Sequence, residues 1–267
     1  MCTSFVSYGD RTLIGMNFDI SDRAIKLVYQ KDSQLLVMQR EGATFFPALG
    51  INKSGTFMNL HMVEENAAGA YRRGKNCVHI MKLFDDVLSE KLAPEDVPAF
   101  ASDHAIVNVP GHSVHSLIAN GERRACIVEP GRKPLQLDSE DVKFVVQTNF
   151  SLMEAKDSGG AADGAYGVER FHLANERLAS AQGMVGVEAG FAVLQETAQL
   201  RGDFPTQLSL ISVPEEGVVY FALQADFERT FSFSFHDQQI RTKQGFQTSR
   251  NSPVTRKGVL LSELSGW

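Results

Sequence analysis

The chain has 267 residues, of which 43% are hydrophobic and 22% are charged, and its formal net charge is −6. A chain of this size can bury a large hydrophobic core, so we expect a globular protein. Acidic and basic residues are interspersed without a sustained basic run, which excludes the charge pattern of a nucleic-acid-binding protein. No apolar run reaches the length of a membrane-spanning helix, and no secretory signal precedes Gly9. We therefore predict a cytoplasmic protein without a membrane anchor.

Short apolar runs alternate with turn signals from Thr3 to about Val63. The runs are rich in β-branched and aromatic residues, and Gly, Asp and Asn residues separate them, which predicts strands joined by tight turns. The predicted strands cover residues 2–10, 12–19, 24–32, 34–39, 47–55 and 56–63.

Two helices follow this first block of strands. Residues 78–92 carry apolar side chains at helical spacing. Residues 93–107 begin with proline and acidic residues, as the first turn of a helix often does. Strands then resume at residues 115–131, where Asn120-Gly121 predicts a hairpin turn.

The second half of the chain repeats this succession of strands and helices. Further strands are predicted before and after a second pair of helices, and the last ones include a hairpin. The strands cover residues 134–138, 142–150, 207–224 and 229–235, and the helices cover residues 168–181 and 186–200.

Strands and helices therefore come in blocks, which predicts an α+β fold rather than an alternating parallel one. Two antiparallel sheets covered by helices would use every block. The Gly- and Ala-rich residues 157–167 lie between elements that such a pair of sheets needs together, so we interpret them as a mobile loop. We find no internal repeat and predict a single domain over residues 1–267.

The three cysteines Cys2, Cys77 and Cys126 are an odd number with wide spacing, which fits neither a disulfide framework nor a paired zinc site. Cys126 lies in a predicted strand, where a thiol behaves as a small hydrophobic group, and both Cys77 and Cys126 are interpreted as packing residues because free cysteines are often buried. Cys2 differs from both, because it directly follows the initiator methionine.

A thiolate rather than a thiol attacks a carbonyl carbon, so a cysteine nucleophile needs a base within reach. Removal of Met1 would give Cys2 its own base. The reference pKa of an α-amino group is about 7.7–8.0 and that of a thiol about 8.5, so a neutral amine can accept the thiol proton near neutral pH. No histidine is then required.

The histidines do not form a recognisable site in the sequence. The spacing of His112 and His115 could suit a metal ion, but no third ligand is evident, and a surface or core role is favoured for both. His172 shares a predicted helix with Arg170 and is interpreted as structural. We expect neither a metal ion nor a cofactor.

The opening residues, MCTSFVSYGDRTLIGMNFD, resemble the start of the choloylglycine hydrolase and penicillin V acylase family of N-terminal nucleophile hydrolases. In that family an N-terminal Cys-Thr opens the first strand and the second strand ends in a Gly-Arg-Asn-x-Asp pattern. The residues at this second motif here are Gly15, Met16, Asn17, Phe18 and Asp19. Weaker motifs follow in the family's order, namely TFMNLHM, CIVEPG, VVQTNF and GVERFHLANERL, so that the resemblance spans roughly residues 2–225.

The resemblance implies a four-layer αββα sandwich, in which two antiparallel sheets lie between helix layers. It implies that Cys2 attacks an amide carbonyl, that its α-amine first takes the thiol proton and later protonates the leaving nitrogen, and that Asp19 holds the ammonium form. Asn59 and Asn149 would each supply one amide donor to the oxyanion hole, from the side chain or the main chain. Arg170 would stabilise the thiolate and the charge that develops at Cys2.

One position departs from the family pattern. Met16 stands where the family has an arginine beside the nucleophile, and a thioether can neither donate a hydrogen bond nor lower a thiol pKa. The departure implies a different substrate, an arginine recruited from elsewhere such as Arg72 or Arg73, or a weak or absent hydrolase activity. The chain is also shorter than typical bile-salt hydrolases, so bile salts are not the first expectation.

The leading hypothesis is an amidase or acylase that cleaves a linear amide with an apolar acyl group and acts on a small molecule. Apolar residues near the proposed nucleophile would bind the acyl group. They are Met16, Phe18, Ile20, Phe57 and Met58.

Two alternatives remain open at this point. An acyltransferase would form the same acyl-enzyme, and a catalytically silent binding protein would share the fold, with Met16 as the main observation in its favour. Glutamine amidotransferases also begin with Met-Cys, but the Gly-Ile that usually follows is absent here. A homo-oligomer is compatible with the sequence.

Overall fold

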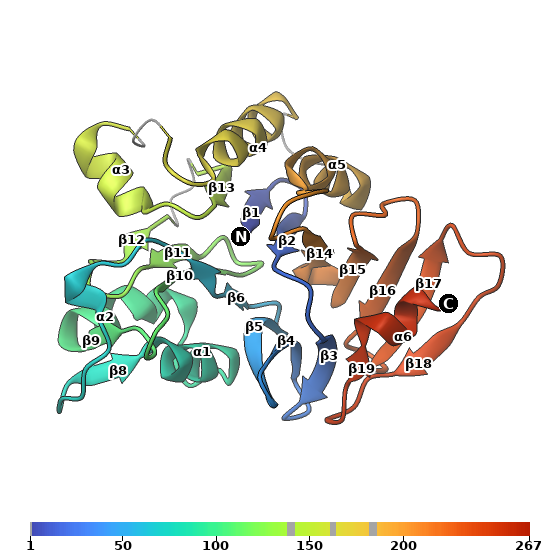
Figure 1. The fold of residues 1–267 in the computed structure, drawn as a ribbon, viewed down its shortest axis with the longest axis horizontal. Helices are drawn as coiled ribbons and strands as arrows, with labels where there is room; N and C mark the ends of the chain where they lie inside the picture. Colours follow the sequence, from blue (N-terminus) through green and yellow to red (C-terminus); the bar gives the residue numbers. More distant parts are fainter. Residues whose placement is uncertain (1, 138–141, 161–163, 182–185) are drawn as a thin grey trace.

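Two large antiparallel sheets face each other across the main hydrophobic core of the computed structural model, and helices cover their outer faces (Figure 1). The structure describes residues 2–137, 142–160, 164–181 and 186–267. The predicted α+β architecture with helix, sheet, sheet and helix layers is therefore confirmed.

The first sheet has the strand order β13-β1-β2-β14-β15-β16-β17-β18. All of its neighbouring strands are antiparallel. Its strands are β1 (Thr3–Tyr8), β2 (Thr12–Asp19), β13 (Phe144–Gln147), β14 (Thr206–Val213), β15 (Val218–Leu223), β16 (Thr230–Ser234), β17 (Gln239–Gln244) and β18 (Asn251–Pro253).

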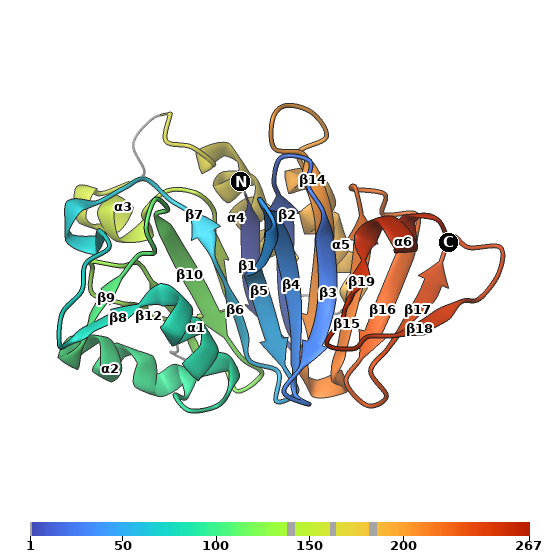
Figure 2. The same ribbon diagram turned by 60° about the horizontal axis from the view of Figure 1, so that its bottom comes forward.

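The second sheet has the order β12-β11-β10-β6-β5-β4-β3-β19, and β7 pairs with β10 beside this path. Figure 2 shows its central strands running side by side. Its strands are β3 (Ile25–Gln30), β4 (Gln34–Glu41), β5 (Thr44–Asn52), β6 (Phe57–Asn59), β7 (His61–Met62), β10 (Val114–Ala119), β11 (Ala125–Val128), β12 (Leu135–Gln136) and β19 (Val259–Leu260).

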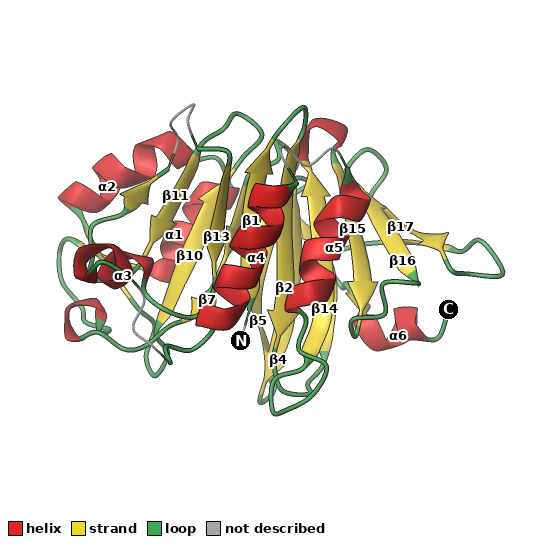
Figure 3. Ribbon diagram, turned by 90° about the horizontal axis from the view of Figure 1, so that it is seen from above, coloured by secondary structure: helices red, strands yellow, loops and turns green. Residues whose placement is uncertain are grey.

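Two pairs of helices form the outer layers. α4 and α5 lie across the first sheet over β1, β2 and β14, as Figure 3 shows, and α1 and α2 pack on the outer face of the second sheet. α3 and α6 are short. The helices are α1 (Ile80–Leu88), α2 (Val97–Asp103), α3 (Leu152–Ser158), α4 (Val168–Ser180), α5 (Val187–Thr197) and α6 (Leu261–Ser265). Three short 3-10 helices cover Ala67–Gly69, Pro94–Asp96 and Pro214–Glu216.

Alternation along β1 and β2 decides which side chains enter which layer, because successive side chains of a strand point to opposite faces. Cys2 and Val6 belong to the core between the sheets, whereas Phe5 packs under α4 and α5. Gly15 makes room for Phe5, since a Cβ atom at Gly15 would lie 2.3 Å from the Phe5 ring. The side chain of Cys2 therefore faces the second sheet.

Most predicted elements of the first half occur as expected, but the second helix is shorter than predicted. The helix predicted over residues 93–107 ends at Asp103, because residues Ala105–Val107 form β9 and pair in parallel with β8 (Cys77–His79). The second half contains a helix that was not predicted, α3, although Ser151 and Glu154 have the spacing of a helix cap. The Ser151 hydroxyl accepts a hydrogen bond from the Glu154 main-chain nitrogen.

The predicted hairpin between β10 and β11 is present, but its turn is wider than a two-residue loop. The Asn120 side chain accepts hydrogen bonds from the main-chain nitrogens of Glu122 and Arg124. Arg123 rather than Gly121 takes the positive φ, at 60°. The asparagine therefore builds the turn with its side chain.

Some positions named in the predictions lie outside the part of the chain that the structure describes. They are residues 161–163 of the loop predicted at 157–167, Met1, and Asp138 at the end of a predicted strand.

The three cysteines form no disulfide, and Cys126 is buried under α1 as a packing residue. No helix among the described residues is long and apolar enough to cross a membrane.

Asn17 fixes α5 to the first sheet and supplies a test of this layer. Its side chain donates to the Leu194 carbonyl over 2.8 Å and to the Thr197 hydroxyl over 3.1 Å, and it accepts from Ser209 over 2.7 Å. Asn17→Ala is expected to lower the free energy of unfolding by about 1–3 kcal/mol, because it leaves buried polar partners unsatisfied. Urea denaturation measures this loss. The exposed Asn251 is the control, and Asn251→Ala should change stability by less than about 0.5 kcal/mol.

Candidate active site

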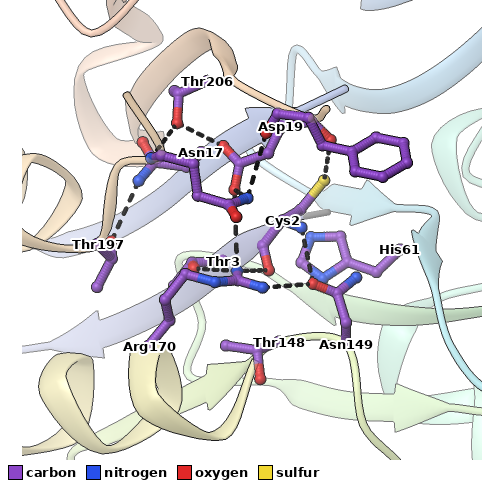
Figure 4. Close-up of polar contacts among 12 residues, drawn as sticks. Cys2, Thr3, Asn17, Asp19, His61, Thr148, Asn149, Arg170, Thr197 and Thr206 are labelled. Atoms are coloured by element: carbon purple, nitrogen blue, oxygen red, sulfur yellow. Dashed lines mark hydrogen bonds and ion pairs between the residues drawn. The ribbon is translucent and has the colours of Figure 1, made fainter. Parts of the chain in front are cut away.

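The main chain at Cys2 is held by the side chain of Asn149, which follows the edge strand β13 and lies beside the start of β1. The Cys2 nitrogen donates to Asn149 Oδ1 over 2.9 Å (Figure 4). The thiol lies 3.8 Å from the main-chain oxygen of Asp19, at the end of β2. Cys2 is buried, with 4% of its surface exposed. The structure thus brings together three residues that are far apart in the sequence.

Arg170, in the first turn of α4, also binds the start of β1. We call the hydrogen-bonded group of Cys2, Asn149 and Arg170 the clamp. Its Nη1 donates to the Cys2 carbonyl over 2.7 Å and to the Thr3 hydroxyl over 2.9 Å. Its Nη2 donates to Asn149 Oδ1 over 2.9 Å. One oxygen of Asn149 therefore accepts from both the Cys2 nitrogen and the guanidinium, so the position of Cys2 depends on all three residues.

Asp19 is buried behind this clamp and accepts two hydrogen bonds from its neighbours. Its Oδ1 accepts from the Thr206 hydroxyl over 2.6 Å, and its Oδ2 accepts from Gln199 Nε2 over 2.9 Å. Nη1 of Arg170 lies 3.8 Å from Oδ2. Burial raises the pKa of Asp19, and these hydrogen bonds and the guanidinium oppose the rise.

The thiol of Cys2 is subject to the same opposing effects. Burial raises the pKa of Cys2, and the negative charge of Asp19 raises it further. The Asp19 main-chain oxygen and the charge of Arg170 lower it. The positive charge of Arg170 therefore favours the thiolate.

The two asparagines expected in an oxyanion hole have other hydrogen-bond partners. Asn59 Oδ1 accepts from the Leu117 main-chain nitrogen over 2.8 Å, and its Nδ2 donates to the Ser4 hydroxyl over 2.9 Å. Asn149 Nδ2 donates to the Met62 carbonyl over 2.8 Å. Asn149 contacts Cys2 as an acceptor, and Asn59 reaches β1 two residues further along, at Ser4.

The residues expected to bind an acyl group are distributed over two layers. Met16 and Phe57 are completely buried in the core that also contains Cys2, and Phe18 joins them. Ile20 packs against this core and is partly exposed. The expectation for Met58 is wrong, because it follows Phe57 on the same strand and its side chain points to the opposite face, under α1.

Neither arginine suggested as a replacement for the family's missing arginine approaches Cys2. Arg72 donates to the Ala68 carbonyl over 2.6 Å, and Arg73 donates to the Tyr71 hydroxyl over 3.3 Å, both within one exposed loop. That suggestion is therefore corrected. Met16 shares the buried face with Cys2, and the nearby guanidinium is that of Arg170.

Sequence reasoning missed Thr206, Gln199 and His61. Thr206 is the cross-strand partner of Asp19 in the register of β2 and β14, so only the sheet pairing identifies it.

The two histidines considered as metal ligands lie in different surroundings. His115 is buried, and its Nε2 lies 2.7 Å from the Thr148 carbonyl. His112 is exposed and lies 3.8 Å from Glu41. In the described part of the chain, no group of three or more His, Cys, Asp or Glu side chains could hold a metal ion.

A cavity of about 220 Å³ lies beyond Asp19, at the end of the first sheet. Its wall includes Asp22 and Arg23 after β2, Gln207 on β14, and Leu261 on α6. None of the five apolar residues predicted to bind an acyl group lines it.

Comparison with solved structures shows the same fold in two kinds of enzyme. A cysteine-to-alanine mutant of the conjugated bile acid hydrolase from Clostridium perfringens is 15% identical, with a TM-score of 0.67 over 96% of this chain and 98% of that one. Penicillin V acylase from Agrobacterium tumefaciens is 14% identical, with a TM-score of 0.67 over 90% of each chain. No protein-family model and no curated protein matches the sequence. The resemblance drawn from the sequence motifs is thus confirmed at the level of the fold.

The electrostatic effect of Arg170 on Cys2 predicts a change in thiol titration. Arg170→Gln should move the pH profile of Cys2 alkylation by iodoacetamide to higher pH, because the variant loses the positive charge that lowers the thiol pKa. The profile is measured in a Cys77→Ser, Cys126→Ala background, so that only Cys2 reacts.

Arg177→Gln is the matched control, because Arg177 lies on the same helix and pairs with Glu196 over 3.2 Å on the surface. Its profile should coincide with that of the parent protein. A profile of Arg170→Gln that also coincides with the parent would contradict the assigned effect.

Proposed function

We propose that this protein is an N-terminal nucleophile amidase, which hydrolyses a linear amide through a thioester on Cys2. The proposal rests above all on one observation: the Cys2 main-chain nitrogen donates to Asn149 Oδ1, and Arg170 donates to the same oxygen. In the chain with Met1 attached this nitrogen belongs to a peptide bond. Removal of Met1 would turn it into an α-amine next to its own thiol, in a place where Asn149 Oδ1 accepts a hydrogen bond from it.

The reaction then follows from the groups at this position. The thiol proton passes to the neutral α-amine, and the thiolate attacks the amide carbonyl carbon to form a tetrahedral oxyanion. The ammonium returns its proton to the amide nitrogen, the C–N bond breaks, and the amine leaves. Water, deprotonated by the same α-amine, attacks the thioester and releases the acid with the thiol restored.

Asp19 and Arg170 would serve this cycle through charge and position. Arg170 holds the carbonyl side of Cys2 and favours the thiolate, and Asp19 supplies a negative charge near the ammonium form. A buried carboxylate needs such partners, because its burial without a counter-charge is costly. The opposite charges of the two side chains, 3.8 Å apart, also compensate each other when the amine is neutral.

The surroundings of the site favour an apolar acyl group. Large hydrophobic side chains are exposed on segments that flank the clamp, and exposed residues of this kind often mark binding surfaces. Met62 and Tyr166 adjoin Asn149 and Arg170, and Phe204 adjoins Gln199. These residues are Met62 (46% exposed), Tyr166 (44%), Leu200 (74%) and Phe204 (36%). As proposed contacts of the substrate they replace most of the residues that the sequence predicted to bind the acyl group, because those residues are buried.

The structural neighbours support the reaction type. One is a hydrolase of conjugated bile acids and the other is a penicillin V acylase, and both activities agree with the proposed cleavage of an amide. Fold alone does not define function, and the clamp on Cys2 is what links this chain to that chemistry.

The first test compares a fusion protein that is cut by a protease to expose Cys2 with the same fusion left uncut. The cut protein should gain the mass of an acyl group from a panel of acylated amides and release amines, whereas the uncut protein should do neither, because its Cys2 nitrogen is a non-basic amide. Intact mass spectrometry reads both results. Cys2→Ala is the control and should form no adduct.

Equal activity of cut and uncut protein would mean that another base serves Cys2, and the proposal would be abandoned. The panel also separates the alternatives kept open by the sequence. An acyltransferase forms the same adduct but transfers it to an added amine faster than to water. A silent binding protein forms no adduct at all.

The second test concerns the acyl group. Phe204→Ser is expected to raise KM for long-chain amides by roughly ten-fold while short-chain amides are unaffected, because apolar contact area is lost. Tyr71→Ser is the matched control, since Tyr71 is 39% exposed and lies in the loop of Arg73, away from the clamp. Equal effects of Phe204→Ser on both chain lengths would remove Phe204 from the acyl site.

A further inference from the structure

His61 is a buried imidazole at the site, and the proposed reaction assigns it no role. It opens β7 on the second sheet and has no exposed surface. Asn59, two residues before it, hydrogen-bonds to Ser4, and Met62, directly after it, accepts from the side chain of Asn149. His61 thus lies between two contacts with the N-terminal strand, and Figure 4 shows its ring beside Cys2.

The hydrogen bonds of Asn59 determine which ring nitrogen of His61 carries the proton. The Leu117 main-chain nitrogen can only donate, so the Asn59 atom that it contacts is the oxygen, and Nδ2 is the opposite atom. Nδ2 has two hydrogens, and one is directed to the Ser4 hydroxyl. The other is directed to His61 Nε2, 3.2 Å away. Nε2 of His61 must therefore accept, and the proton of the neutral ring is on Nδ1.

The ring is neutral for a physical reason. Burial lowers the pKa of His61 well below its ordinary value, and the neighbouring imidazole of His115 lowers it further, while the Thr148 carbonyl opposes the change. A neutral imidazole has one donor and one acceptor. For His61 the acceptor is satisfied by Asn59, and the donor is Nδ1–H.

In the described part of the chain no group is in hydrogen-bond geometry with this donor, because the Thr148 carbonyl, which is near enough to oppose the fall in the pKa of His61, is hydrogen-bonded to His115 Nε2 over 2.7 Å. Buried polar groups are nearly always paired, so an unpaired buried N–H beside a nucleophile points to a partner that arrives with the substrate. His115 does not play the same part. Its Nε2 must donate to the Thr148 carbonyl, so its own unpaired Nδ1 is an acceptor, and the two ring centres are 6.0 Å apart.

We propose that Nδ1–H of His61 is a donor to the carbonyl oxygen of the acyl group, and that it stabilises the oxyanion formed when Cys2 attacks. The inference rests on the proposed function and makes it more specific. Asn59 then acts as a positioning residue, because its Nδ2 fixes the tautomer of His61. Its side chain does not itself reach the oxyanion. A neutral donor suits this role, because it retains its proton throughout the cycle.

The tautomer is tested first, without substrate and without a variant. A proton–nitrogen correlation spectrum of protein with labelled histidine distinguishes the two neutral tautomers. His61 should carry its proton on Nδ1 and His115 on Nε2. A proton on Nε2 of His61 would overturn the proposal.

The second experiment uses labelled hexanal, a linear aldehyde that needs only a reactive thiol. The thiolate sulfur adds to the aldehyde carbon, the carbonyl electrons move to the oxygen, and the proton that left the thiol is transferred to that oxygen, which gives a hemithioacetal with the tetrahedral geometry of the intermediate. The Nδ1 proton of His61 should shift when the adduct forms. A proton signal that does not move, or the absence of any adduct with Cys2, would contradict the assigned donor.

The third experiment compares His61→Phe, which fills the space without a donor, with His61→Gln, which retains an N–H. His61→Phe should weaken the hexanal adduct and slow acylation by about a hundred-fold, and His61→Gln should recover part of both. Alkylation of Cys2 by iodoacetamide should stay within about two-fold, because that reaction forms no oxyanion. His112→Phe, at an exposed histidine, is the control and should behave like the parent.

The outcomes separate this inference from the proposed function. A protein whose hexanal adduct depends on His61, but which forms no thioester with any amide, would disprove the amidase and retain the donor. Equal losses in His61→Phe and His61→Gln, or a parallel loss of alkylation, would show that His61 acts on packing or on the thiol instead. If His61→Phe does not fold, the tautomer and the proton shift of the parent protein still decide the matter.

Discussion

The hydrogen bonds that join Arg170, Asn149 and the main chain of Cys2 are the constraint on which the site depends. They connect the first turn of α4, the segment after β13 and the beginning of β1, so they fix the position of the Cys2 main chain. Thr3 pairs with Asn17 in the neighbouring strand, which continues the constraint into the sheet. The thiol is consequently held at one place, beside the main-chain oxygen of Asp19.

Placing this clamp between two sheets has an electrostatic consequence. Burial alone opposes the charged forms of both Cys2 and Asp19, as their raised pKa values indicate. Arg170 and the donors from Thr206 and Gln199 restore part of the solvation that water would provide. The site therefore combines a low-dielectric environment with fixed dipoles, which is the condition in which preorganised groups stabilise developing charge most strongly.

The sequence predicted most of the fold, because alternation and helical spacing are local signals that tertiary contacts here reinforce. The strand predicted at residues 12–19 matches β2, and the helix predicted at 78–92 contains α1. The errors also have physical causes. Residues Ala105–Val107 look like the end of a helix until β8 offers them a parallel partner, and the strands after Phe235 extend the first sheet and close the edge of the second through pairings that no local pattern reveals.

For the site, the resemblance of the sequence motifs to a known family implied that Cys2, Asp19, Asn149 and Arg170 belong together, and the structure brings these four residues together. What each side chain does was decided by the tertiary structure. Asn149 accepts at Cys2, and Asn59 faces Ser4 and His61, since the direction of an amide depends on partners that are distant in sequence. His61 gave no signal, because the tautomer of a buried imidazole is determined only by the hydrogen bonds that surround it.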